Sequence, residues 1–350
     1  MRKTATGKYM KVLTVCAALI LVGAVAAFSA GEAKSYMSSL HKSGAGMKYW
    51  YEAKDGFQSV TGMPYDDLAC KSCHPDNCKK CHVKSMKAED TRDMAVCEGC
   101  HTREKITFEK DKAENSLDVH IAKGKICHDC HKGAAFDDIH GDGKTYNSLY
   151  DAGAVNAKCE NCHPADKMPD IDSHKKHKDK LACAACHTKA ATACTNCHFD
   201  SFLKDQKEEG NHMTSTSWTM LVNYNGKVTT GTAITAVYKN KKFIAYAPSY
   251  THSVQKQAKK CEECHGNEAM KLIKSGAKIP MNKFEGGKTI DWVGSVPLLP
   301  ESLAWTFYNK EGDKWVPIPG DEAPVVQMVG GATPLTDKQI KMMNAPFKSK

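Results

Sequence analysis

The sequence predicts a fold of mostly irregular segments and short α-helices packed around bound prosthetic groups, with a small β-meander insertion and a mixed C-terminal tail. Three observations lead to this fold class. Sixteen of the 17 cysteines recur in one short motif, seven copies of the motif lie between residues 70 and 198, and residues 217–247 are rich in Thr, Val, Ile and aromatic side chains. The motif-rich region has few long apolar runs, so it cannot bury enough apolar surface to fold alone.

The repeated motif is Cys-x-x-Cys-His, and it occurs eight times. It is the attachment signature of c-type haem, in which two thiolates bond to the haem vinyl groups and the histidine reaches the iron. Zinc sites, disulfide frameworks and redox-active pairs also use Cys-x-x-Cys, but none of them requires the histidine. The sequence therefore predicts eight covalent haems c. Their expected anchors and proximal ligands are Cys70, Cys73 and His74; Cys78, Cys81 and His82; Cys97, Cys100 and His101; Cys127, Cys130 and His131; Cys159, Cys162 and His163; Cys183, Cys186 and His187; Cys194, Cys197 and His198; and Cys261, Cys264 and His265.

The N-terminus has the pattern of a secretory signal. Four basic residues precede residues 12–28, which are uncharged and mostly apolar, and small residues follow at 29–31. We expect residues 1–30 to be a signal peptide that is cleaved, and the alternative is an uncleaved anchor. The one cysteine outside the motifs, Cys16, lies in this segment. The chain is therefore expected to be periplasmic or otherwise exported.

The haems also explain the basic composition. The formal net charge is +9, and removal of the four basic residues of the signal leaves +5. Each ferric haem adds about −1 through its two propionates, so eight haems bring the total to roughly −3. The lysines then mostly balance propionates and form a solvated surface, and nucleic-acid binding has little support.

Four regions are expected along the chain. After the signal at 1–30, residues 31–200 are predicted to form a seven-haem region of short helices and loops that folds only when haem is bound. Residues 201–265 are predicted to form a β-rich insertion followed by the eighth motif, and residues 266–350 a haem-free C-terminal region.

Local signals place turns and one helix in the last two regions. Asn225-Gly226 is a hairpin signal, and residues 239–242 look like a second turn. Residues 304–308 could pair with 314–318, and Thr336 is expected to cap a short helix at 337–343.

The occupant of the second axial position decides what a haem does. A filled position favours electron transfer, whereas an open one allows substrate chemistry. The chain has eight histidines outside the motifs, one for each predicted haem. The alternative for an isolated histidine is a surface or hydrogen-bonded residue, but the matching number favours ligation. The candidate distal ligands are His41, His120, His128, His140, His174, His177, His212 and His252.

His128 is unusual because it lies between the two cysteines of one motif, in the sequence CHDCH. It cannot easily reach the iron of its own haem, because the short loop lies across the ring edge and His131 takes the proximal side. We expect His128 to ligate the iron of a neighbouring haem, and the alternative is a solvent-facing loop residue.

The stretch HKKH at residues 174–177, just before the motif at Cys183, resembles the cytochrome c3 and c7 families. There, two histidines spaced by two residues precede a haem motif and serve different haems. The broader layout resembles multihaem c-type cytochromes of anaerobic respiration, including octahaem reductases of the tetrathionate-reductase and hydroxylamine-oxidoreductase type. All eight motifs here end in His, so the Lys-ended motif of some nitrite reductases is absent.

Two functions from different classes follow. The first is an electron carrier between a membrane quinol-oxidising complex or another cytochrome and a terminal acceptor, and the histidine count favours it. The alternative is a periplasmic reductase of a small nitrogen or sulfur oxyanion, such as tetrathionate, nitrite or hydroxylamine, with one open haem. The expected partners are other redox proteins, and any membrane association would come through such a partner. No nucleotide-binding, hydrolase or HExxH motif is present, and no catalytic residue is predicted.

Overall fold

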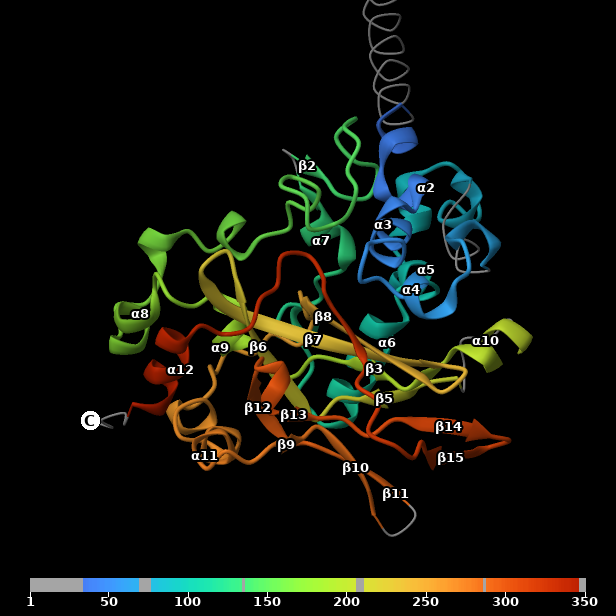
Figure 1. Ribbon diagram of the computed structural model, residues 1–350. Helices are drawn as coiled ribbons and strands as arrows, with labels where there is room; N and C mark the ends of the chain where they lie inside the picture. Colours follow the sequence, from blue (N-terminus) through green and yellow to red (C-terminus); the bar gives the residue numbers. More distant parts are fainter. Residues whose placement is uncertain (1–33, 69–76, 134–135, 206–210, 286–287, 346–350) are drawn as a thin grey trace, which may run out of the picture.

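The computed structural model of the chain describes residues 34–68, 77–133, 136–205, 211–285 and 288–345 (Figure 1). The predicted signal at 1–30 and the first motif, Cys70, Cys73 and His74, lie outside the described residues. Within the described ranges, no helix combines the length and the apolar character needed to cross a bilayer.

Short helices form the described N-terminal part and recur along the rest of the chain. They are α2 (Leu40–Ser43), α3 (Ala45–Tyr51), α4 (Gln58–Thr61), α5 (Met94–Glu98), α6 (Thr102–Ala113), α7 (Cys127–His131), α8 (Asp172–His177), α9 (Cys183–His187), α10 (Phe199–Asp205), α11 (Glu268–Lys274) and α12 (Asp337–Asn344). Ser39 begins α2 by accepting a hydrogen bond from the Lys42 N–H, and Gly44, at φ 63°, turns the chain into α3. Figure 1 shows α2 to α5 as one group, from which α6 leads towards the sheet.

A six-stranded mixed sheet lies at the centre of the fold. Its strands are β4 (Cys197–His198), β6 (Trp218–Tyr224), β7 (Lys227–Tyr238), β8 (Lys241–Pro248), β12 (Gly294–Pro297) and β16 (Val325–Met328). The order is β12-β6-β7-β8-β16, and β4 pairs with one end of β7. Strands β6, β7 and β8 form an antiparallel meander, whereas β12, β16 and β4 run parallel to their partners.

The main apolar core packs on this sheet. Trp218 and Met220 of β6 are buried together with Val296 of the neighbouring β12 and Ala269 of α11. At the rim, the Trp305 indole N–H donates a hydrogen bond of 3.0 Å to the Tyr246 hydroxyl on β8. Residues from the C-terminal region thus complete the core that the meander begins.

The predicted fold class is wrong in its main point, because a mixed sheet and not a set of helices around haems forms the centre of the described fold. The sequence analysis predicts a small inserted meander and a separate haem-free tail, but β12 and β16 of that tail are the two edges of the sheet. The physical reason is burial on both faces of β7, where Thr230, Thr232 and Thr235 are at most 2% exposed. Threonines that look solvent-facing in the sequence belong to the interior, so the meander needs cover from other segments.

The predicted turns and the last helix are confirmed. Asn225 and Gly226, at φ 50° and 78°, connect β6 to β7, as expected for a two-residue hairpin loop. Lys239 and Asn240, also at positive φ, form the second turn. Thr336 caps α12 with its side chain.

Smaller two-stranded ladders surround the sheet. They are β1 (Lys132–Gly133) with β2 (Phe136–Asp137), β3 (Ala193–Thr195) with β5 (Met213–Ser215), β9 (Ile279–Pro280) with β13 (Leu303–Ala304), β10 (Asn282–Glu285) with β11 (Lys288–Asp291), and β14 (Tyr308–Glu311) with β15 (Lys314–Pro317). The predicted hairpin near residues 304–318 is therefore present, but its first strand begins later than the sequence suggests.

Gly231 on β7 allows β6 and β7 to pack closely. A Cβ at this position would lie 2.3 Å from Val222 Cγ1 and 2.9 Å from the Ala247 carbonyl oxygen. We expect Gly231→Ala to lower the free energy of unfolding by about 1–3 kcal/mol, because overpacking forces neighbouring side chains and backbone to move. Urea unfolding of the haem-loaded protein, followed by far-ultraviolet circular dichroism, measures the change. Gly46→Ala on α3 is the control, since a Cβ there makes ordinary contacts; equal loss in both variants would contradict the prediction.

Candidate functional site

Most of the described motifs fold as one helical turn. In four of them the histidine N–H donates a hydrogen bond of 2.8–2.9 Å to the carbonyl oxygen of the first cysteine, and two more are the complete helices α7 and α9. Positions i, i+3 and i+4 of a helix share a face, so both thiols and the imidazole lie on one side of the turn. The motifs with this form begin at Cys78, Cys97, Cys127, Cys159, Cys183 and Cys261.

Six motif histidines each face the ring of a histidine outside the motifs. The ring centroids of every pair are 6.1–6.3 Å apart. Each pair joins one candidate proximal ligand to one candidate distal ligand, even where the two are far apart in sequence. The pairs are His82 with His140, His101 with His41, His131 with His252, His163 with His120, His187 with His174, and His265 with His177.

One short helix supplies the partners of two motifs. His174 and His177 both lie on α8. His174 faces His187, in the next motif along the chain, whereas His177 faces His265, whose motif follows the meander. The position of α8 therefore depends on two motifs that are separated by the β-rich segment.

Backbone carbonyl oxygens meet the Nδ1 atoms of several paired histidines. Such a contact at Nδ1 fixes the orientation of the ring and leaves Nε2 directed away from it. These contacts join His41 to Ile139 (3.0 Å), His82 to Lys87 (3.3 Å), His174 to Pro169 (2.9 Å), His177 to Ser173 (2.8 Å) and His187 to Gln255 (3.1 Å).

Carboxylate oxygens lie close to the Nδ1 atoms of other paired histidines. Asp118 lies 3.2 Å from His120 Nδ1, Asp137 lies 3.1 Å from His140 Nδ1, and Asp138 lies 3.4 Å from His131 Nδ1. The fourth is Glu104, 3.7 Å from His101 Nδ1 and 3.9 Å from His252 Nδ1. Burial opposes the charge on Glu104, but these two imidazoles outweigh it and hold the pKa of the carboxyl below its ordinary value.

Sequence reasoning missed these carboxylates. A local signal existed for two of them, because Asp118 precedes His120 by two residues and Asp137 precedes His140 by three. The contact between Glu104 and His252 joins α6 to the end of the meander, so only the fold reveals it.

The cysteines connect six motifs in a continuous series. Thiols of neighbouring motifs in this series lie close together; for example, a hydrogen bond from Cys159 lowers the pKa of Cys183 to about 6. In each of the four motifs between the two ends of this series, one cysteine lies next to a thiol of the preceding motif and the other lies next to a thiol of the following motif. The neighbouring thiols are Cys81 and Cys100, Cys97 and Cys127, Cys130 and Cys162, Cys159 and Cys183, and Cys186 and Cys261.

The seventh motif folds differently. Cys194 and Cys197 lie on β3 and β4, and the buried Asn196 between them has φ 51°. The Nδ1 atom of His198 lies 3.0 Å from Ser201 Oγ, and no second histidine ring faces His198 among the described residues. Its backbone N–H donates a 2.7 Å hydrogen bond to the carbonyl oxygen of residue 211, which brings the neighbouring His212 to this motif.

The expected role of His128 stays a prediction. The ring of His128, on α7, lies near Lys132, Arg92 and His140. Burial is the largest cause that lowers the pKa of His128, and the positive charges of Lys132 and Arg92 lower it further. In the described part of the chain no second histidine ring faces it, and the motif of His74 lies outside that part.

Comparisons with known proteins point to one class. No protein-family model and no solved structure matches the chain. Among curated proteins the chain is similar to Multiheme cytochrome MtrA of Shewanella baltica (strain OS185), with 27% identity over 152 residues. The match covers 40% of this chain, and it spans 41% of that protein's length. Together with the repeated motif, this similarity supports the class of multihaem c-type cytochromes.

The six histidine pairs fit haem iron. A metal–imidazole bond is roughly 2.0–2.1 Å long and the ring centre lies about 1.1 Å beyond the nitrogen, so imidazoles on opposite sides of one metal have centroids about 6.2 Å apart. The observed 6.1–6.3 Å agrees with this value. The motif cysteines that the structure describes are free thiols, and no three His, Cys, Asp or Glu side chains in the same ranges are grouped around a bare-metal position.

Asp118 connects the segment of His120 to the end of the meander. It is 4% exposed and accepts hydrogen bonds from the backbone N–H groups of His120 and Val254, at 2.8 and 2.7 Å. We expect Asp118→Ala to destabilise the protein by about 1–3 kcal/mol, because two backbone N–H donors lose the buried carboxylate that accepts from them. Urea midpoints measure the effect. Asp170→Ala removes a carboxylate that is 82% exposed and should change the midpoint little, so equal shifts would contradict the prediction.

Proposed function

We propose that the chain is an octahaem c-type cytochrome that carries electrons between redox partners. The observation that carries the proposal is the set of six histidine pairs, each with the spacing of two axial ligands and each next to the thiols of a Cys-x-x-Cys-His motif. The similarity to a multihaem cytochrome supports the same conclusion.

In this proposal the motif cysteines anchor haem, and each of the six pairs supplies both axial imidazoles of one iron. Two motifs and two histidines remain. His212 is assigned to the motif of His198, supported by the backbone hydrogen bond between residues 198 and 211. His128 is then assigned to the motif of His74 by elimination.

Haem iron supplies one-electron redox chemistry, and ligation by two imidazoles favours lower potentials than ligation by His and Met. Nδ1 contacts orient most of the paired imidazoles, and the six pairs would hold haem iron from two sides. An electron carrier needs neighbouring centres, and the line of thiols from Cys81 to Cys261 supports a continuous row of six.

The two ends of this row are proposed as the places where electrons enter and leave. One end is the motif at Cys78 and the other is the motif at Cys261, beside α11. The proposed partners are other cytochromes or a membrane quinol-oxidising complex. An exported, periplasmic location is supported by the signal-like pattern of residues 1–30.

The haem count is tested by mass. Intact-protein mass spectrometry of the chain, produced with haem-attachment machinery, should show eight covalent haem additions. A mass equal to the polypeptide alone, or to the polypeptide with zinc, would overturn the proposal. If the mass shows fewer than eight additions, peptide mapping then identifies which cysteines carry haem and which do not.

His128 separates the electron carrier from the reductase alternative. If it is a distal ligand, His128→Ala should convert one low-spin haem to a high-spin form, and resonance Raman spectroscopy should detect that change in the haem marker bands. His140→Ala is the positive control, because His140 stacks against His82 at 6.3 Å. Asp129→Asn, at the other position between the same cysteines, should leave all haems low-spin.

A different result would contradict this assignment. If wild-type protein already holds a high-spin haem and His128→Ala adds no second one, His128 is not a ligand. Turnover of nitrite, hydroxylamine or tetrathionate at that open haem would then favour the reductase.

A further inference from the structure

Glu104 lies between the axial histidines of two different pairs. It is in the first turn of α6, just after the motif that ends at His101. Its Oε2 is 3.7 Å from His101 Nδ1 and its Oε1 is 3.9 Å from His252 Nδ1. His101 faces His41, whereas His252 faces His131, so one carboxylate meets the ligands of two neighbouring haem sites.

Among the described residues, Glu104 supplies the carboxylate within ion-pair distance of the Nδ1 atom of His252. This nitrogen is buried and makes no hydrogen bond in the structure, and the carboxylate of Glu104 is the acceptor within ion-pair distance. An imidazole bound to metal through Nε2 carries a hydrogen at Nδ1, and ligating histidines almost always donate that hydrogen to a carboxylate, a carbonyl or water. The carboxylate of Glu104 is therefore placed to accept this hydrogen.

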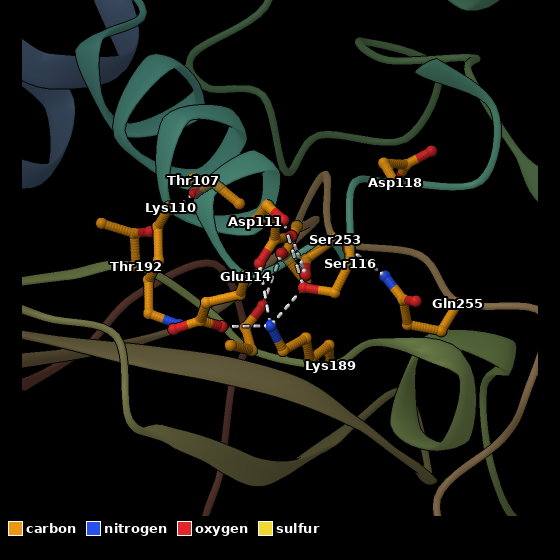
Figure 2. A network of polar contacts seen from close by, with 12 residues as sticks. Thr107, Lys110, Asp111, Glu114, Ser116, Asp118, Lys189, Thr192, Ser253 and Gln255 are labelled. Atoms are coloured by element: carbon orange, nitrogen blue, oxygen red, sulfur yellow. Dashed lines mark hydrogen bonds and ion pairs between the residues drawn. The ribbon is translucent and has the colours of Figure 1, made fainter. Parts of the chain in front are cut away.

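A polar network around the buried side chains of Asp111 and Ser253 connects the two sides of this contact. Figure 2 shows Lys189 between α6 and the segment that follows His252. The Lys189 ammonium contacts Asp111, Glu114 and Ser116, and the Ser253 hydroxyl donates to the carboxylate of Asp111, which is 1% exposed. Since Ser253 directly follows His252 and Asp111 lies on the helix of Glu104, the network holds His252 against α6.

The other histidine of the same site also meets a carboxylate. Asp138 lies 3.4 Å from His131 Nδ1. By contrast, His174 and His187 meet only backbone carbonyl oxygens at Nδ1. The six sites thus differ in the negative charge that surrounds their ligands, and Glu104 contributes to two of them.

We propose that Glu104 is a shared positioning residue that lowers the reduction potentials of two adjacent haems, the one ligated by His41 and His101 and the one ligated by His131 and His252. This inference rests on the proposed function. Reduction adds one electron to a ferric iron and gives ferrous iron, with no bond broken and no proton moved. The negative carboxylate stabilises the ferric state, which carries one more positive charge, so it makes each reduction harder.

The test compares Glu104→Gln with a matched control on the same helix. Spectroelectrochemical titration of the intact haem-loaded protein should show two one-electron components shifted to higher potential in E104Q. For each, the ratio of reduced to oxidised haem at a fixed potential should rise roughly tenfold, equal to about 59 mV. Glu109→Gln removes an α6 carboxylate that is 66% exposed and pairs with Lys105, and it should shift none.

Asp138→Asn identifies which components are involved. It should shift a single component, and in the double variant with E104Q that same component should shift further than in either single variant. This pattern follows only if both carboxylates act on the haem of His131 and His252.

The outcomes separate this inference from the function on which it rests. E104Q protein with the full haem mass, low-spin spectra and wild-type potentials would overturn the role of Glu104 alone, as would a shift of only one component or an equal shift in E109Q. Absence of covalent haem in wild-type protein would overturn the proposed function itself. If E104Q fails to take up haem, Glu104→Asp keeps the charge but shortens its reach, and it should shift the same two components by less; unchanged components would overturn the inference.

Discussion

Six motif imidazoles each face an imidazole from elsewhere in the chain, and these six pairs join segments that are far apart in the sequence. The pair of His41 with His101 joins the first described helices to α6, and the pair of His131 with His252 joins α7 to the segment after the meander. Segments that lack apolar side chains are thereby held at fixed points. If an iron lies between the rings, as proposed, ligand binding and folding are coupled in this half of the chain.

The two halves are stabilised by different physics. The sheet has a conventional apolar core around Trp218, whereas the motif-rich half contains buried carboxylates, such as Asp111 and Asp118, that accept hydrogen bonds from defined donors. The network around Asp111 and Lys189 connects the halves, because it joins α6 to the strand-rich segment through Ser253. The carboxylate of Asp111 is buried, and a buried charge is costly unless it is satisfied, which explains why it contacts both Lys189 and Ser253.

Local sequence signals predicted local structure well and long-range structure poorly. The Asn225-Gly226 turn and the Thr336 cap follow from the conformations of a few adjacent residues, so they could be predicted. The six-stranded sheet could not be predicted. Its edge strands β12 and β16 come from a region without strong strand patterns, and the threonines that are buried on β7 are polar residues, which in a sequence suggest exposure to solvent. For the site, the motif histidines and the eight candidate partners are visible in the sequence, and the fold places six of these candidates opposite motif histidines, whereas Glu104 meets His252 only after folding.

Low-temperature electron paramagnetic resonance of the fully oxidised protein tests whether the six histidine pairs hold haem iron. Imidazoles on both sides of an iron give low-spin ferric haem, so we expect low-spin signals that integrate to at least six haems per chain, one for each histidine pair. High-spin ferric signals from more than two haems would contradict it, because at least one of the six pairs would then not be a pair of axial ligands.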